Sequence, residues 1–355
     1  MISIGQRTRR NALVIGLSLV ALAACSPAAD KGPAKPTDTI NFSILATESS
    51  TSLQSFWTPI IADMEASTGL KIKPFYGSNY TALIEAMRFK QTDLGWFSNL
   101  SGLEATRRAD GEIFARTFDP SGDDGYTSVI IVPAKSKTTL EDVLKCDKTL
   151  NFGIGDAKST SGTLAPKTYL FSPRGIRVAD CFKTVKSANH QSNLFSVANG
   201  VLDVATNNST AMRLQKERDP ERAAKGEPTI TDKVRVIWTS PGLPEDPIIW
   251  RKDLDPSVKE KLRQFFLTYG QGTGPEAERQ RKLLSAVSIG GFKPADATHL
   301  LPVREMEATE ALEEARIVGD AAKTAAAQKT LDGIKAERAV ADAKAGKVPA
   351  SLPQP

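Results

Sequence analysis

The chain has 355 residues, with 46 lysines and arginines against 41 aspartates and glutamates, which gives a formal net charge of +5. Arg7, Arg9 and Arg10 lie in the first 24 residues, which contain no acidic residue. Without these three, 43 basic residues face 41 acidic ones, so the charge excludes the general nucleic-acid affinity that an isoelectric point of about 9.0 would otherwise indicate.

The N-terminus has the pattern of a bacterial lipoprotein signal peptide. A basic segment precedes the apolar residues 12–22, and Leu22-Ala-Ala-Cys25 matches a cleavage site at which the cysteine becomes lipidated. We therefore expect residues 1–24 to be removed, Cys25 to carry a membrane lipid in the periplasm, and residues 25–38 to form a flexible tether. The alternative, a transmembrane anchor, needs about 20 apolar residues, and this run is shorter.

The length beyond the tether predicts more than one lobe. About 300 residues are more than a single hydrophobic core normally holds. The predicted division is a first lobe of residues 39–130 and 241–304, a second lobe of residues 131–240, C-terminal helices at 305–345 and a tail at 346–355.

The first lobe shows a repeated order of strands and helices. Strands are predicted at 39–46, 70–75 and 93–96, and helices at 53–68, 80–89 and from Asn99 onward. This order predicts an α/β architecture in which loops at the strand ends line a crevice.

The second lobe is predicted to begin and end with strands that cross between the lobes. Residues 125–133 are the strongest strand by β-branched content, and residues 234–238 and 247–250 are expected to return the chain to the first lobe. Between them we predict helices at 139–144 and 193–199, strands at 182–187 and 201–206, and a charged surface excursion at 215–233. Two crossings predict a hinge.

The C-terminal part is predicted to be helical. A helix is expected at 256–269, and residues 304–345 are rich in Ala, Glu, Lys and Arg, with Gly319, Gly333 and Gly346 as interruptions. The apolar face is thin, which suits packing along a lobe or against a partner subunit in a homodimer. A partly solvated helical tail is the alternative.

Residues 152–163 carry the strongest chemical signal. An apolar strand end runs into Gly155 and Asp156, and Ser159, Thr160 and Ser161 then stand where a helix covering 163–171 should have its N-cap and first turn. Free N–H groups, the helix dipole and hydroxyl donors can together bind a phosphate-like anion without lysine or arginine. An ordinary serine cap is the alternative.

Two cysteines remain after lipidation of Cys25. In an oxidising compartment Cys146 and Cys181 favour a disulfide over a metal site, because only His190 and His299 are present to complete a zinc set. We expect no metal and no cofactor.

Several further segments occur together with this helix start: Thr47-Glu48-Ser49, Asp93-Leu-Gly-Trp96, Asn99-Leu-Ser101, Gly125-Tyr126, Asn189-His190, Val204 to Asn208, Asp246-Pro247, Trp250-Arg-Lys252 and Leu301-Pro-Val-Arg304. The combination, over roughly residues 40–305, resembles the periplasmic phosphonate-binding proteins of ATP-driven (ABC) importers. The resemblance implies a type II periplasmic-binding fold, with two α/β lobes that close on a ligand. It also implies binding rather than catalysis, with transport carried out by a partner permease and ATPase.

Carried over by position, the resemblance implies an anion cradle of hydroxyl and imidazole groups made by Ser159, Thr160, Ser161, Tyr126 and His190. A protonated His190 would add charge to that cradle. Tyr80 would pack over the ligand, and Asp246 would face its organic tail. The alternative for both tyrosines is a plain aromatic on a lobe surface.

One position departs from the family pattern. Members that select 2-aminoethylphosphonate tend to have a glutamate after the Asn-Asn-Ser/Thr segment, whereas this chain has Asn207-Asn208-Ser209-Thr210. Asp246 alone would then face the amine, so an amine-free ligand such as methylphosphonate or phosphite is an equal alternative. Inorganic phosphate in the same fold is a further alternative. A hydrolase with Ser159 or Ser161 as nucleophile and His190 as base is disfavoured, because neither Gly-x-Ser-x-Gly nor Ser-x-x-Lys is present.

Overall fold

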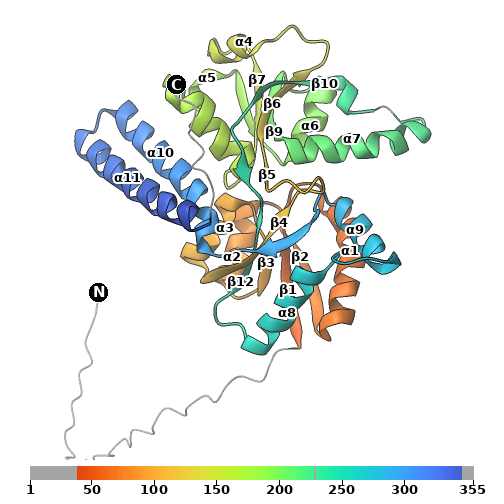
Figure 1. Ribbon diagram of the computed structural model, residues 1–355. Helices are drawn as coiled ribbons and strands as arrows, with labels where there is room; N and C mark the ends of the chain where they lie inside the picture. The colour runs from red at the N-terminus through yellow and green to blue at the C-terminus, as the bar shows by residue number, and fades with distance from the viewer. Residues whose placement is uncertain (1–37, 228, 346–355) are drawn as a thin grey trace, which may run out of the picture. The chain divides into compact units, whose positions relative to one another are not determined.

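The computed structural model describes residues 38–227 and 229–345, which belong to one compact unit with two main β-sheets (Figure 1). The predicted signal peptide, the lipidated Cys25, nearly all of the tether and the tail at 346–355 lie outside the described residues. Within the described ranges, no helix is both long and apolar enough to cross a membrane.

The first sheet has the strand order β13-β4-β12-β3-β1-β2. Its strands are β1 (Thr39–Ile44), β2 (Lys71–Tyr76), β3 (Leu94–Trp96), β4 (Gly111–Phe118), β12 (Pro247–Arg251) and β13 (Gly291–Pro294). The associated helices are α1 (Ser50–Thr68), α2 (Tyr80–Arg88), α3 (Asn99–Arg108), α8 (Pro256–Thr268), α9 (Pro275–Ser285) and the 3₁₀ turn η5 (Ala297–Leu300). We call this set of elements the first lobe. Its core is aromatic: Phe42, Trp57, Phe114 and Trp250 are all at most 1% exposed.

The second sheet has the order β10-β6-β9-β7-β8 and defines the second lobe. Its strands are β6 (Ser128–Pro133), β7 (Asn151–Ile154), β8 (Thr184–Ser187), β9 (Val204–Asn208) and β10 (Val234–Thr239). Its helices are α4 (Leu140–Leu144), α5 (Val178–Cys181), α6 (His190–Ala198), α7 (Ser209–Ala224), the π turns η1 (Thr160–Leu164) and η2 (Lys167–Phe171), and the 3₁₀ turns η3 (Ser172–Arg174) and η4 (Thr231–Lys233). A disulfide joins Cys146, after α4, to Cys181 at the end of α5.

A two-stranded ribbon accompanies the two crossings between the lobes. The strand β5 (Gly125–Tyr126) pairs antiparallel with β11 (Leu243–Pro244). The strand predicted at 125–133 is therefore two strands, of which β6 lies in the second sheet. Residues 234–238 do not return the chain to the first lobe, because β10 pairs with β6; the return is made by β12, which pairs with β3 and β4.

Local sequence signals set the boundaries of α1. The helix ends at Gly69 with φ +67°, as predicted, but it starts three residues before the predicted residue 53, because Ser49 caps it and its side chain accepts from Ser52 N. The left-handed conformation at Gly69 has little steric cost because glycine lacks a Cβ. Most described residues of the predicted surface excursion at 215–233 are exposed, but the part up to Ala224 is helical: α7 starts from an Asn208 cap and continues through Pro220.

The C-terminal residues form an antiparallel helical hairpin. It consists of α10 (Leu301–Val318) and α11 (Ala321–Lys344), which are separated at Gly319, as predicted, whereas Gly333 lies inside α11. A small apolar cluster of Ala308, Leu312, Leu331 and Ile334 lies between the two helices. The hairpin also contacts the first lobe, since Arg107 on α3 pairs with Glu307 at 2.6 Å.

Candidate ligand-binding site

A cavity of about 70 Å³ lies between the two lobes. Its walls are strand-end loops and helix starts, as expected for the crevice of an α/β protein. It is lined by seven of the eight candidate ligand-binding residues, including Thr210, the position that departs from the family pattern: Tyr80, Tyr126, Ser159, Ser161, His190, Thr210 and Asp246. The eighth, Thr160, does not line it.

The helix of residues 160–174 begins at this cavity and opens with a π turn, a rare geometry that is frequent at functional sites. Ser159 is the N-cap, and its Oγ accepts a hydrogen bond from Gly162 N at 2.9 Å. A Cβ at Gly155 would lie 2.5 Å from the Gly162 Cα, so this approach of strand to helix requires glycine. Because the first amides of a helix have no acceptor inside it, the helix directs N–H groups toward this end of the cavity.

Thr160 contacts the first lobe instead of the cavity. Its side chain is fully buried, and its Oγ1 accepts a hydrogen bond from Leu100 N at 2.9 Å. The three consecutive hydroxyls thus have different surroundings, which their sequence does not distinguish. Only the Ser159 and Ser161 side chains reach the cavity.

Ser161 and Tyr126 form the part of the wall nearest the hinge ribbon. Asn208 Nδ2 donates to Ser161 Oγ at 3.2 Å, and Ser128 Oγ donates to the Ser161 carbonyl at 2.6 Å. Tyr126 is 8% exposed, and burial, followed by the nearby Asp246, raises its pKa well above its ordinary value. Tyr126 therefore remains a neutral phenol, able to donate to an anion.

His190 is the first residue of α6, behind the cap residue Asn189. Its Nε2 lies 3.5 Å from Ser159 Oγ, and its Nδ1 is buried with no hydrogen-bond partner among the described residues. Burial lowers the pKa of His190 to about 4, so the imidazole is neutral near pH 7 in the free protein. The predicted positive charge on His190 is therefore absent from the free site, and the ring acts as a neutral hydrogen-bonding group.

Two adjacent acidic residues, Glu245 and Asp246, form another part of the cavity wall. Asp246 Oδ1 and Glu245 Oε1 are both buried and lack a hydrogen-bond partner among residues 38–227 and 229–345. Burial raises the pKa of Asp246 well above its ordinary range, with Glu245 as the next cause, and burial raises that of Glu245 to about 7. A buried carboxylate that lacks partners is costly, and a bound cation would relieve that cost.

Glu48 and Arg218 form a satisfied ion pair in the same wall. Arg218 Nη1 lies 2.8 Å from Glu48 Oε1, and Arg218 Nη2 donates to the Ala286 carbonyl at 3.0 Å. The guanidinium also lies over the Phe56 ring, 4.3 Å from its centroid. Since Glu48 is in the first lobe and Arg218 on α7 of the second, this pair joins the lobes.

A family model of the periplasmic substrate-binding proteins of phosphonate ABC transporters matches residues 42–300. The chain belongs to this family. It is also 39% identical over 268 residues, 75% of each chain, to a phosphonates-binding periplasmic protein of Escherichia coli. A probable ABC transporter phosphite-binding protein of Prochlorococcus marinus is 28% identical over 169 residues, 46% of this chain and 53% of that one.

Solved structures give the same result for the fold. A binding-protein component of an ABC phosphonate transporter from Pseudomonas aeruginosa is 36% identical, with a TM-score of 0.79 over 87% of this chain and all of that one. A Prochlorococcus marinus protein solved with methylphosphonate is 18% identical, with a TM-score of 0.64 over 76% of this chain and 97% of that one, and so compares in fold only. The two-lobe type II periplasmic-binding fold is confirmed.

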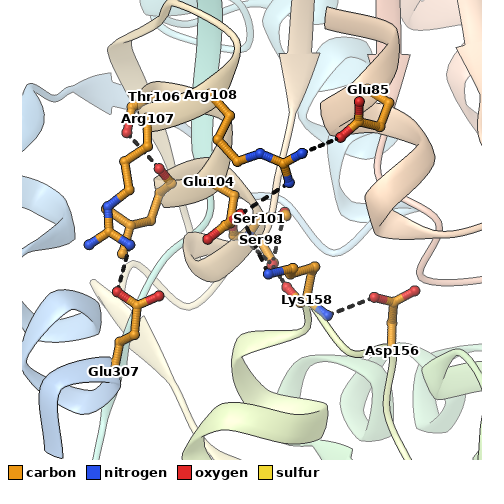
Figure 2. Close-up of polar contacts among 11 residues, drawn as sticks. Glu85, Ser98, Ser101, Glu104, Thr106, Arg107, Arg108, Asp156, Lys158 and Glu307 are labelled. Atoms are coloured by element: carbon orange, nitrogen blue, oxygen red, sulfur yellow. Dashed lines mark hydrogen bonds and ion pairs between the residues drawn. The ribbon is translucent and has the colours of Figure 1, made fainter. Parts of the chain in front are cut away.

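In this phosphonate-binding family member, the loop before the helix start also joins the lobes (Figure 2). Ser98 Oγ donates to the Lys158 carbonyl at 2.8 Å, and Lys158 Nζ lies 3.5 Å from Glu104 Oε2 on α3. Asp156 Oδ2 accepts from Tyr80 N at 3.1 Å. Contacts between the lobes therefore come from residues directly beside those that line the cavity.

Three charged residues of the cavity wall received no ligand-binding role from sequence reasoning. Glu245 is adjacent to the predicted Asp246, and Glu48 follows the buried strand β1, so the rule that strand-end loops line the crevice was a usable signal for both. Arg218 gave no signal of this kind, because its segment was interpreted as a surface excursion rather than as α7.

Proposed function

We propose that this protein captures a small phosphonate with a cationic tail in the interlobe cavity and delivers it to the permease of an ABC importer. It does so by binding, without chemical conversion. The family and the shared fold support the phosphonate class and the ABC partner. The choice of tail is argued from the cavity of this chain.

The observation that carries the proposal is the division of the cavity into two chemical ends. Ser159, Ser161 and His190 offer helix amides, hydroxyls and an imidazole, which suit an oxyanion. Glu245 and Asp246 present carboxylates with unsatisfied buried oxygens, which suit an ammonium group. An anionic head and a cationic tail on one molecule match both ends, and 2-aminoethylphosphonate is the simplest such ligand.

The size of the cavity supports a compact ligand. A buried water molecule needs ~10–15 Å³ of such a cavity, so 70 Å³ holds about five to seven small heavy atoms. Methylphosphonate and 2-aminoethylphosphonate fall within this range, whereas a nucleotide does not. Phosphite and inorganic phosphate also fit by size, but they leave the two carboxylates without a partner.

The location follows from the N-terminus. We propose that Cys25 carries the lipid and that the tether lets the two lobes reach the permease from the membrane surface. Cell fractionation of wild type and Cys25→Ser tests the anchor: the protein should move from the membrane fraction to the soluble periplasmic fraction. A homodimer through residues 305–345 stays a prediction, which sedimentation velocity of the mature protein tests.

Isothermal titration calorimetry of the mature protein tests the ligand. We expect 2-aminoethylphosphonate to bind more tightly than methylphosphonate, phosphite and phosphate, and ³¹P NMR to show the bound phosphonate released unchanged. Tightest binding by phosphate would identify a phosphate-binding protein of the same fold. Appearance of a new phosphorus species would instead support a hydrolase that uses the Ser159–His190 pair.

A further inference from the structure

Glu245 is a buried carboxylate that the resemblance does not assign to the ligand. We propose that Glu245 is a specificity-determining residue, which together with Asp246 binds the cationic tail of the ligand and supplies the second carboxylate that Thr210 lacks. This inference rests on the proposed function, since it requires that a phosphonate occupies the interlobe cavity.

The backbone holds Glu245 rigidly at the cavity wall. It lies between β11 and β12, where its carbonyl is 2.6 Å from His299 Nε2 and its Oε2 accepts from Thr117 Oγ1 at 2.9 Å. The next residue, Asp246, is fixed through its carbonyl, which accepts from Thr117 N at 2.9 Å. Both residues are therefore anchored at the start of β12, beside its neighbouring strand β4.

The unsatisfied oxygens indicate a missing cation. Glu245 is 7% exposed, and one of its oxygens is hydrogen-bonded to Thr117 while the other, Oε1, has no partner in the described part of the chain. Asp246 Oδ1 is likewise buried and has no hydrogen-bond partner in the described part of the chain. The guanidinium groups that act on Glu245 at a distance, Arg116 and Arg213, hydrogen-bond to Asp124 and Asp119. The two adjacent carboxylates repel one another, and an ammonium between them would supply donors to both.

The other polar residues of the wall are less suited to this role. Glu48 already has Arg218 as a partner, and Thr210 carries no charge. Thr210 is also in the first turn of α7, where the helix dipole would repel a cation unless a carboxylate were present to bind it. Glu245 therefore offers the cation-binding oxygen that position 210 lacks.

If Glu245 only held Thr117 in place near the hinge, the expected result would differ. Loss of the hydrogen bond between Glu245 and Thr117 would then weaken the binding of all ligands alike, because it would disturb lobe closure. A tail-binding role affects only ligands that carry the cation. The ratio of two affinities therefore separates the two roles.

The experiment compares 2-aminoethylphosphonate with propylphosphonate, which has a methyl group in place of the ammonium, by calorimetry at pH 7.5. In wild type the amine-bearing ligand should bind more tightly. Glu245→Gln keeps the side-chain shape, and it should weaken 2-aminoethylphosphonate about 10- to 100-fold, the range for a charge-assisted hydrogen bond, while leaving propylphosphonate within about threefold. Adding Thr210→Glu to Glu245→Gln should restore part of the lost preference.

Two controls complete the design. Glu112→Gln on β4 removes the same charge outside the cavity and should leave the ratio unchanged, and thermal melts without ligand show that each variant is folded. An unchanged ratio in Glu245→Gln, with both ligands still bound, would overturn the role of Glu245 while leaving the proposed function intact. Failure of wild type to bind any phosphonate would overturn both.

Discussion

Ser161 is the hydroxyl of the helix start that faces the cavity without also capping the helix. In Ser161→Ala the Ser159 cap remains, so we expect a normal unfolding temperature but a loss of ~1–3 kcal/mol in phosphonate binding, the cost of removing one partner from a desolvated oxyanion. Calorimetry measures the loss. Ser172→Ala, at the far end of the same helix, is the matched control, and an equal loss in both variants would remove Ser161 from the site.

His190 should make the free protein sensitive to acid. Its pKa is about 4 when folded and about 6.5 when unfolded, so the unfolded state binds a proton first. The stability that depends on neutral His190 is therefore complete above pH 6.5 and is lost as the pH falls through 4, by about 3 kcal/mol. Denaturant unfolding at pH 7, 5.5 and 4 should show a steeper decline for wild type than for His190→Gln. Parallel declines would contradict a buried neutral imidazole.

The candidate site was partly readable from residue types. Hydroxyls at a helix start have a local signature, which made Ser159 and Ser161 candidates, whereas His190 became a candidate only through the family resemblance. The Thr160 side chain accepts from the Leu100 amide, and Thr117 holds one oxygen of Glu245 at the cavity wall. Both facts depend on partners far away in the chain, which local pattern does not contain.

At the scale of elements, most strands of the two sheets were predicted, including the mixed sequences that form β2 and β8, but β4 was not. Residues 39–46 and 93–96 emerged as β1 and β3 because both faces of these strands are buried. The strand β4 was missed, although it pairs with β12 and β13, because Glu112, Arg116 and Thr117 interrupt its apolar pattern. Those polar residues find partners in Lys259, Asp124 and Glu245, so their placement is a tertiary effect.

The disulfide links the segment after α4 to the end of α5 in the second lobe. It closes a loop across 35 positions and contributes ~2–4 kcal/mol to stability, chiefly by restricting the unfolded chain. The double variant Cys146→Ser/Cys181→Ser should lose that amount in denaturant unfolding but bind phosphonate with wild-type affinity, because neither cysteine lines the cavity. Reductant should lower wild-type stability and leave the variant unaffected. A matching loss of affinity would show that the bond also shapes the site.

At the scale of the whole molecule, Thr160 should control closure and not selectivity. Thr160→Val leaves the Leu100 amide without an acceptor when the lobes meet, whereas water satisfies it when they part. We expect affinity for 2-aminoethylphosphonate and propylphosphonate to fall by the same factor, about 5- to 10-fold. Calorimetry with both ligands checks this, and a change in their ratio would place the Thr160 hydroxyl against the ligand.

The placement of lobe contacts beside the cavity has a mechanical consequence. Tyr80 and Asp246 belong to the first lobe, and Ser161 and His190 to the second, while Lys158 and Thr160 join the two at the helix start. A force that pulls the lobes apart breaks these hydrogen bonds between the lobes, and the same movement separates the two halves of the cavity. Separating the lobes therefore lowers the affinity for the ligand. A transporter that holds one lobe and displaces the other can release the ligand without inserting any group of its own into the cavity.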